Sequence, residues 1–125
     1  MLHQVSLGTA DLTRAREFYD PVMRVLGLDR TLEADDAVGY GAGITVFSLN
    51  RPVDGSAPVP GNGVHVAFEV EKRAAVDAFF RTALAQGGTS DGEPGLRPHY
   101  DAHYYAAFVR DPDGNKIEAL TFAAA

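Results

Sequence analysis

The order of hydrophobic and polar residues changes from strand-like to helical within the first 30 positions. Over residues 3–7 the odd positions share one face and the even positions the other, which predicts a half-buried strand. Asp11 stands where a helix N-cap is expected, and an apolar stripe follows at helical spacing: Leu12, Ala15, Phe18, Tyr19 and Val22. Pro21 is expected to kink this helix or to end its regular part, and Gly27 to close it. Three short strands are expected near 30–33, 38–40 and 44–49.

A second segment repeats this order after a stretch that favours neither helix nor central strand. Residues 51–63 are rich in proline and glycine, which predicts a linker. Beyond it we expect a strand over 64–70 and a helix over 74–86 that Gly87 and Gly88 stop. A long irregular stretch follows, and then two strands over 104–110 and 116–122. Pro112 and Gly114 supply the fixed and positive φ values of the tight turn between these strands.

The two segments correspond to one another position by position. His3 and His65 are 62 positions apart and each opens a strand, while Phe18 and Phe80, also 62 apart, lie on the following helices. A repeated strand–helix–strands unit is the economical interpretation. We therefore expect one α+β domain over residues 1–125, with modules at 1–50 and 64–122 joined by the linker 51–63.

Composition and charge narrow the classes of function. The chain has 125 residues, 46% of them hydrophobic and 22% charged, which fits one ordinary globular domain. Its net charge of −6 argues against a nucleic-acid or anionic-membrane partner. The absence of cysteine restricts any metal to nitrogen and oxygen ligands. No signal peptide and no apolar run of about 18 residues is visible, so a cytoplasmic location is the default expectation.

Three residues form a candidate metal site: His3, His65 and Glu118. If equivalent strands of paired modules lie side by side, the two histidines face one another. Two imidazoles and a carboxylate suit zinc, nickel, manganese, cobalt or ferrous iron and leave coordination positions open. Taken singly, each residue has an ordinary alternative: a solvated terminal histidine, a core histidine and an edge-strand charge. The histidine at the same point of both modules favours the metal site.

A loop before the penultimate strand holds further ionisable and aromatic groups: Arg97, Tyr100, His103 and Tyr104. Their functional interpretation is a cavity wall, with Arg97 pairing a substrate anion and the others donating hydrogen bonds or shuttling protons. The alternative is an exposed loop whose tyrosines pack against a dimer partner. The residues alone leave both interpretations open.

The ending Phe-Val-Arg-Asp-Pro-Asp-Gly-Asn-Lys-Ile-Glu over 108–118 is the most specific motif in the chain. Together with Glu-Phe-Tyr at 17–19 and Leu-Gly-Leu at 26–28, it resembles the vicinal oxygen chelate superfamily, the group of glyoxalases, bleomycin resistance proteins and extradiol dioxygenases. The resemblance implies paired βαβββ modules that form a cupped mixed sheet around a metal held by His3, His65 and Glu118. It also implies a homodimer with its sites near the subunit boundary and a small-molecule substrate.

One departure from the family pattern bears on the activity. Glyoxalase I-like members carry a further carboxylate on the last strand of the first module, where this chain has Val-Phe-Ser-Leu at 46–49. Proton abstraction beside a carbonyl needs a positioned base, so glutathione-dependent glyoxalase I activity is not expected. We expect a divalent-metal-dependent lyase or isomerase acting on a small oxygenated substrate. The alternatives are an extradiol-type dioxygenase on ferrous iron, a protein that sequesters a small molecule or antibiotic, and an accessory dimerisation module.

Overall fold

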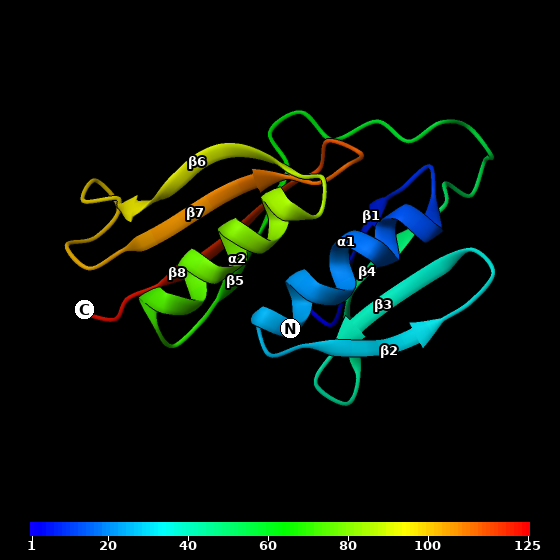
Figure 1. The fold of residues 1–125 in the computed structure, drawn as a ribbon. Coiled ribbons are helices and arrows are strands. Elements are labelled where there is room, and N and C mark those ends of the chain that lie inside the picture. The colour runs from blue at the N-terminus through cyan, green and yellow to red at the C-terminus, as the bar shows by residue number, and fades with distance from the viewer.

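Two mixed four-stranded sheets and two helices make up the chain in the computed structural model, which describes all of residues 1–125 (Figure 1). The first module comprises β1 (Val5–Gly8), α1 (Leu12–Val25), β2 (Asp29–Glu33), β3 (Ala37–Gly41) and β4 (Thr45–Asn50). The second comprises β5 (His65–Glu69), α2 (Arg73–Ala85), β6 (Thr89–Leu96), β7 (Tyr105–Arg110) and β8 (Lys116–Thr121). Neither helix is long and apolar enough to cross a membrane.

Both sheets have the same topology, which confirms the expected α+β architecture of two βαβββ modules. The strand orders are β1-β4-β3-β2 and β5-β8-β7-β6. In each sheet the first strand of the module pairs in parallel with the last, and the other neighbours are antiparallel. The two strands that open the modules, β1 and β5, therefore each lie at the edge of a sheet.

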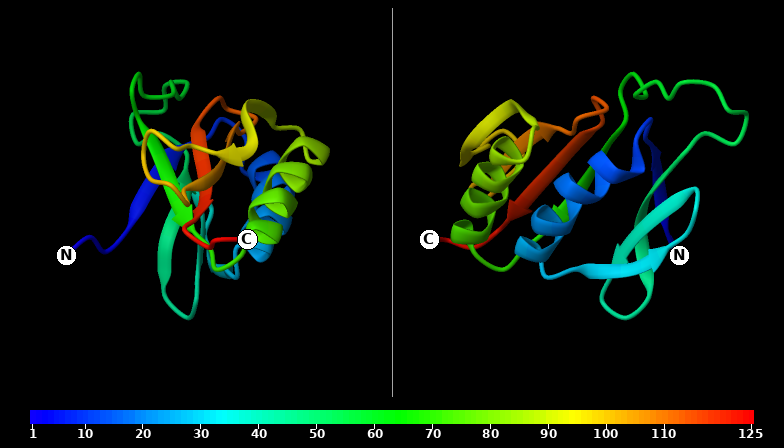
Figure 2. Two further views of the ribbon diagram at one scale, coloured as in Figure 1. Left: turned by 90° about the vertical axis from the view of Figure 1, so that its left-hand side faces the viewer. Right: turned by 45° about the vertical axis from the view of Figure 1, so that its right-hand side comes forward.

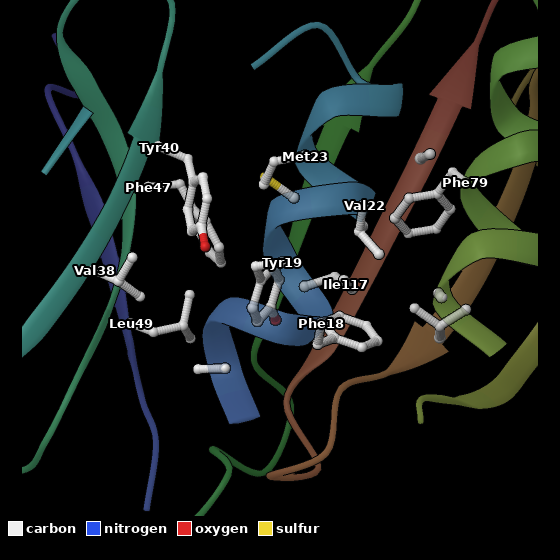
Figure 3. Packing of buried hydrophobic residues seen from close by; sticks show 14 of the residues in the cluster. Phe18, Tyr19, Val22, Met23, Val38, Tyr40, Phe47, Leu49, Phe79 and Ile117 are labelled. Atoms are coloured by element: carbon white, nitrogen blue, oxygen red, sulfur yellow. The ribbon is translucent and has the colours of Figure 1, made fainter. Parts of the chain in front are cut away.

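The hydrophobic core joins the two modules through α1. The helices lie beside one another (Figure 2). In the close view, Tyr19 and Met23 of α1 point toward the first sheet, while Phe18 and Val22 point toward Phe79 of α2 (Figure 3). All five side chains are at most 1% exposed. Because one helix buries apolar side chains against both modules, neither module can keep its core without the other.

Local signals set the ends of α1 as the sequence predicts, but Pro21 does not end it. The Asp11 side chain accepts a hydrogen bond from the Arg14 amide at 3.0 Å, and Gly27 has the positive φ of 84° that a helix stop favours. The helix continues through Pro21 to Val25. The proline removes the amide that would pair with the carbonyl of Glu17, and Glu17 lies on the exposed side where that carbonyl can be solvated.

The stretch expected to be irregular contains an eight-residue strand, β6, and here the sequence prediction was wrong. Gly92, Pro94 and Gly95 interrupt any alternation within it. The strand lies at the edge of its sheet, where proline is tolerated, and its register with β7 shifts on both sides of Gly92. This segment is a strand because it pairs with β7, since its own residues have no strand propensity.

The correspondence between the modules is 61 positions and not the predicted 62. Phe18 and Phe79 are both fully buried at equivalent points of the two helices, whereas Phe80 is only half-buried. In the opening strands, Val5 pairs with core-facing Phe47, and Val66 pairs with core-facing Ile117. The repeat partner of His65 is therefore Gln4, and His3 is one position out of register.

The turn over 111–115 has a second role that its turn-forming residues did not reveal. Asp113 accepts hydrogen bonds from the Thr9 hydroxyl at 2.6 Å, the Ala10 amide at 2.9 Å and the Arg14 guanidinium at 2.7 Å. Asn115 donates to the carbonyl of Gly8 at 2.9 Å. The turn that precedes β8 is thus fastened to the end of β1 and the start of α1.

A buried carboxylate supports this turn from within. Asp111 is 4% exposed and accepts from the Tyr19 hydroxyl at 2.6 Å, from the Asn115 side chain at 3.0 Å and from the Asn115 amide at 2.9 Å. Burial raises the pKa of Asp111, although the hydrogen bonds from Tyr19 and Asn115 oppose that shift. We call this network, made of Asp111, Asp113 and Asn115 with their partners in the first module, the inter-module clamp.

Candidate metal and substrate site

Three side chains of the second module meet on the face of its sheet that points away from α2: His65, Tyr104 and Glu118. The Nε2 atom of His65 lies 3.0 Å from Oε1 of Glu118, and the Tyr104 hydroxyl donates to Oε2 at 2.5 Å. Glu118 is 2% exposed, whereas the His65 side chain is 43% exposed. A nearly buried carboxylate needs partners, and here both of its oxygens have one.

Strand register explains why residues so far apart in the chain meet. In β8, Lys116 and Glu118 point to this face, while Ile117 and Ala119 point to the core. Glu118 pairs with Phe108 of β7 on one side and with Ala67 of β5 on the other. Two residues before Ala67 in β5, and therefore on the same face, His65 pairs with Lys116, and its ring reaches across to Glu118.

Tyr104 is held in place by aromatic neighbours as well as by Glu118. Its ring packs edge-on against Tyr100 at 5.0 Å and against Phe122 at 5.3 Å between centroids. Desolvation first, and then the hydrogen bond to Glu118, raise the pKa of Tyr104 well above its ordinary value. The phenol therefore keeps its proton at neutral pH and acts as a donor that fixes one oxygen of Glu118.

The first module carries a neutral version of the same arrangement. Ser48 pairs with Ser6 across β4 and β1 as Glu118 pairs with Ala67 across β8 and β5. Gln4 donates to the Ser48 hydroxyl at 3.1 Å, as His65 meets Glu118. Only the second module thus offers an imidazole and a carboxylate to a metal ion.

The structure brings together two of the three predicted metal ligands. His65 and Glu118 converge, and their nitrogen and oxygen atoms form part of a donor set that zinc and related divalent ions accept. His3 precedes β1 with its side chain exposed. No group of three or more histidine, aspartate or glutamate side chains within one chain could hold a metal ion.

The loop residues predicted as a cavity wall have different surroundings. The Arg97 guanidinium donates to the carbonyls of Glu93 at 2.8 Å and Gly95 at 2.9 Å, and lies 5.5 Å from the centre of the Phe108 ring. Tyr100 is 59% exposed and packs on Tyr104. His103 is exposed. Of these residues, Tyr104 contacts Glu118 directly. Tyr100 packs on Tyr104, and Arg97 lies over Phe108, the neighbour of Glu118 in the sheet.

Sequence reasoning missed several residues of this face, among them Gln4, Ser48, Phe108 and Lys116. The signal for two of them was present. Lys116 shares a face with Glu118 by simple alternation in the predicted strand, and Phe108 alternates with the core residues of its own strand. Gln4 and Ser48 needed the correct repeat register, which the strand pairing alone establishes.

Comparisons with known proteins agree with this architecture. Residues 1–119 match the sequence model of the Glyoxalase/Bleomycin resistance protein/Dioxygenase superfamily. A glyoxalase/bleomycin resistance protein from Albidiferax ferrireducens T118 is 34% identical with a TM-score of 0.88, over 94% of this chain and 96% of that one. Comparison with curated proteins gave no match.

More distant solved structures share the fold. A glyoxalase/bleomycin resistance protein/dioxygenase family enzyme from Burkholderia phytofirmans PsJN is 21% identical with a TM-score of 0.76, over 98% of each chain. A lactoylglutathione lyase from Agrobacterium tumefaciens is 23% identical with a TM-score of 0.68, over 97% of this chain and 92% of that one. With two βαβββ modules, the match over residues 1–119 and these relatives, the chain belongs to the glyoxalase/bleomycin resistance protein/dioxygenase superfamily.

Proposed function

We propose that the protein is a divalent-metal-dependent enzyme acting on a small oxygenated substrate, with His65 and Glu118 as two of its metal ligands. The observation that carries this proposal is the approach of His65 Nε2 to within 3.0 Å of a glutamate that is 2% exposed. An imidazole and a shielded carboxylate on one open sheet face are donors that such ions take readily. Membership of a superfamily that includes glyoxalases and dioxygenases supports the same function.

The residues around Glu118 have separate tasks in this proposal. A divalent ion, when bound, would supply Lewis acidity toward a substrate oxygen. Tyr104 donates to Oε2 of Glu118 and so orients the carboxylate, as groups outside the ligand set commonly do. Phe108 lies next to Glu118 in the sheet and offers an apolar surface to the carbon skeleton of a substrate.

We place the third ligand in residues 3–4 of a second copy of the chain. His3 is the candidate from the sequence, and Gln4 occupies the place equivalent to that of His65. Both β1 and β5 are edge strands, and unpaired strand edges favour association. Four large apolar side chains near these strands are also exposed: Ile44, Val46, Val64 and Phe122. A homodimer that sets β1 of one copy beside β5 of the other would cover both edges and complete the site.

Metal analysis of tag-free protein tests the proposal, because a tag could disturb ligands so near the terminus. We expect about one divalent ion per chain, lost in His65→Ala and Glu118→Gln, with dimers seen by sedimentation. Loss of metal in His3→Ala or in Gln4→Ala identifies the third ligand. If neither variant loses metal, completion of the site by a second copy is wrong.

The activity class is separated by two further measurements. Oxygen uptake with catechols in the ferrous form would identify an extradiol-type dioxygenase, whereas turnover without oxygen would identify a lyase or isomerase. Wild-type protein that takes up no zinc, nickel, manganese, cobalt or ferrous iron would refute the metal-dependent proposal. Small-molecule sequestration and an accessory dimerisation module would then be the remaining alternatives.

A further inference from the structure

A recess opens beside His65, on the side away from Tyr104. It has a volume of about 360 Å³ and is lined by residues 60–64 of the linker, His65, Arg110 and Lys116. It is separate from the aromatic cluster around Tyr104, yet it shares the exposed imidazole of His65 with the candidate metal site.

Strand pairing brings its three basic side chains, one imidazole and two cations, together. His65 pairs with Lys116 across β5 and β8, and Lys116 pairs with Arg110 across β8 and β7. The three side chains thus form one row across the sheet, two residues along each strand from the row that holds Glu118 and on the same face. Lys116 also lies 5.1 Å from the centre of the Phe108 ring, which limits where its ammonium group can point.

The row has more positive than negative charge although the whole chain is acidic. Asp91 is the one carboxylate in ion-pair contact with Arg110 and Lys116, and a single oxygen, Oδ2, lies 3.1 Å from Arg110 Nε and 3.3 Å from Lys116 Nζ. Arg110 also donates from Nη1 to the Gly114 carbonyl at 3.1 Å. Two cations therefore share one acid in a protein of net charge −6.

Donor capacity remains after these contacts. An ammonium group has three N–H donors and a guanidinium has five. Asp91 occupies one direction of Lys116, and Nη2 of Arg110 takes no part in the contacts with Asp91 and Gly114. The Lys116 side chain is 32% exposed and that of Arg110 40%, so both can reach a bound molecule. Such donors with surplus charge are the usual partners of carboxylates and phosphates.

We propose that this recess binds an anionic group, a carboxylate or a phosphate, of a small substrate whose other end lies at His65 and Glu118. The inference rests on the proposed function for the position of the reacting end, but anion binding itself needs no metal. A volume of about 360 Å³ is near the lower limit for ligand pockets, which favours a compact anion over a bulky conjugate. The substrate class is therefore a small oxygenated acid or phosphate ester.

Calorimetric titration of the full chain with inorganic phosphate and with acetate, before and after removal of metal, tests the inference. We expect at least one of the two anions to bind, and Lys116→Met to weaken its binding about tenfold, because one charge-assisted contact is lost. Lys72→Met removes the other lysine of the chain, at the N-cap of α2, and should leave binding unchanged. Asp91→Asn should strengthen binding, because it frees both cations.

The variants also guard against a folding artefact, since Lys116→Met and Asp91→Asn are expected to act in opposite directions. Stronger binding of phosphate than of acetate indicates a phosphate ester, and the reverse indicates a carboxylic acid. The inference is overturned if wild-type protein binds neither anion, or if Lys116→Met and Lys72→Met bind equally well. Metal content, measured on the same preparations, reports on the proposed function alone.

Discussion

Removal of the Asp113 side chain should loosen the attachment between the two modules. In Asp113→Ala the Thr9 hydroxyl and the Ala10 amide lose a carboxylate acceptor that is 7% exposed, and Arg14 loses its ion pair. Hydrogen bonds to a shielded charge contribute about 1.5 kcal/mol each at the lower end, so these two account for about 3 kcal/mol. The Arg14 side chain is 44% exposed, and its contact adds little because solvent screens it.

Urea and thermal unfolding measure this loss. A decrease of about 3 kcal/mol corresponds to a fall of about 10 °C in Tm for a chain of this size. Asp54→Ala is the matched control, because Asp54 accepts one hydrogen bond, from the Ser56 amide, within the exposed linker. That variant should stay within about 0.5 kcal/mol of wild type. The effects of Thr9→Val and Asp113→Ala should also be less than additive when combined.

A loss below about 1 kcal/mol in Asp113→Ala would refute the reasoning, because it would mean that the inter-module clamp is not needed to hold the modules together. Equal losses in Asp113→Ala and Asp54→Ala would have the same meaning. Full additivity with Thr9→Val would show that the hydrogen bond of 2.6 Å contributes no coupling energy.

Three further variants test other parts of the structure. The raised pKa of Asp111 means that its protonated form contributes stability that is fully present below the ordinary value of 3.8 and is lost as pH rises through the folded-state pKa. The free energy of urea unfolding of wild type should therefore fall relative to Asp111→Asn across that window. Tyr104→Phe removes the donor to Glu118 and should weaken metal binding by about tenfold or more in a competition titration. Gly41→Ala should destabilise by about 2 kcal/mol or more in thermal unfolding, because a Cβ there would lie 1.7 Å from the Ile44 carbonyl oxygen.

Each of these predictions has a contrasting result. Parallel pH profiles for wild type and Asp111→Asn would contradict the effect of burial on that carboxyl. Tyr100→Phe is the control for Tyr104→Phe, because Tyr100 is 59% exposed and donates no hydrogen bond to Glu118; equal metal affinities in the two variants would be contrary to the orienting role. Gly43→Asn is the control for Gly41→Ala. Asparagine tolerates the positive φ of this position, and no atom lies within 4 Å of an added Cβ, so the loss of stability should be much smaller than in Gly41→Ala.

Structural features that depend on residues close together in the chain were predicted from the sequence. The N-cap at Asp11, the helix stop at Gly27, the apolar stripe of α1 and the turn over 111–115 each depend on a few adjacent positions. The alternation of β8 likewise placed Glu118 opposite the core-facing residues of its own strand. Such features need no knowledge of distant contacts, because propensity, capping and periodicity operate within one or two turns of chain.

Other features of the fold required partners that are distant in sequence. The segment 89–96 becomes β6 only through its pairing with β7, since its glycines and proline give no alternation. The acids of the 111–115 turn bind the first module across about 100 positions, which no local pattern records.

What the sequence determined by itself is the duplicated strand–helix–strands plan and the presence of an imidazole and a carboxylate, in His65 and Glu118, on strands of the second module. Tertiary structure decided which side chains meet. A shift of one residue moves every side chain of a strand to its other face, so the register of β1 with β4 selects Gln4, and not His3, as the counterpart of His65. That choice is made by the pairing of β1 with β4, which packs Leu7 against the core and leaves Gln4 beside Ser48, and spacing along the chain does not contain this pairing.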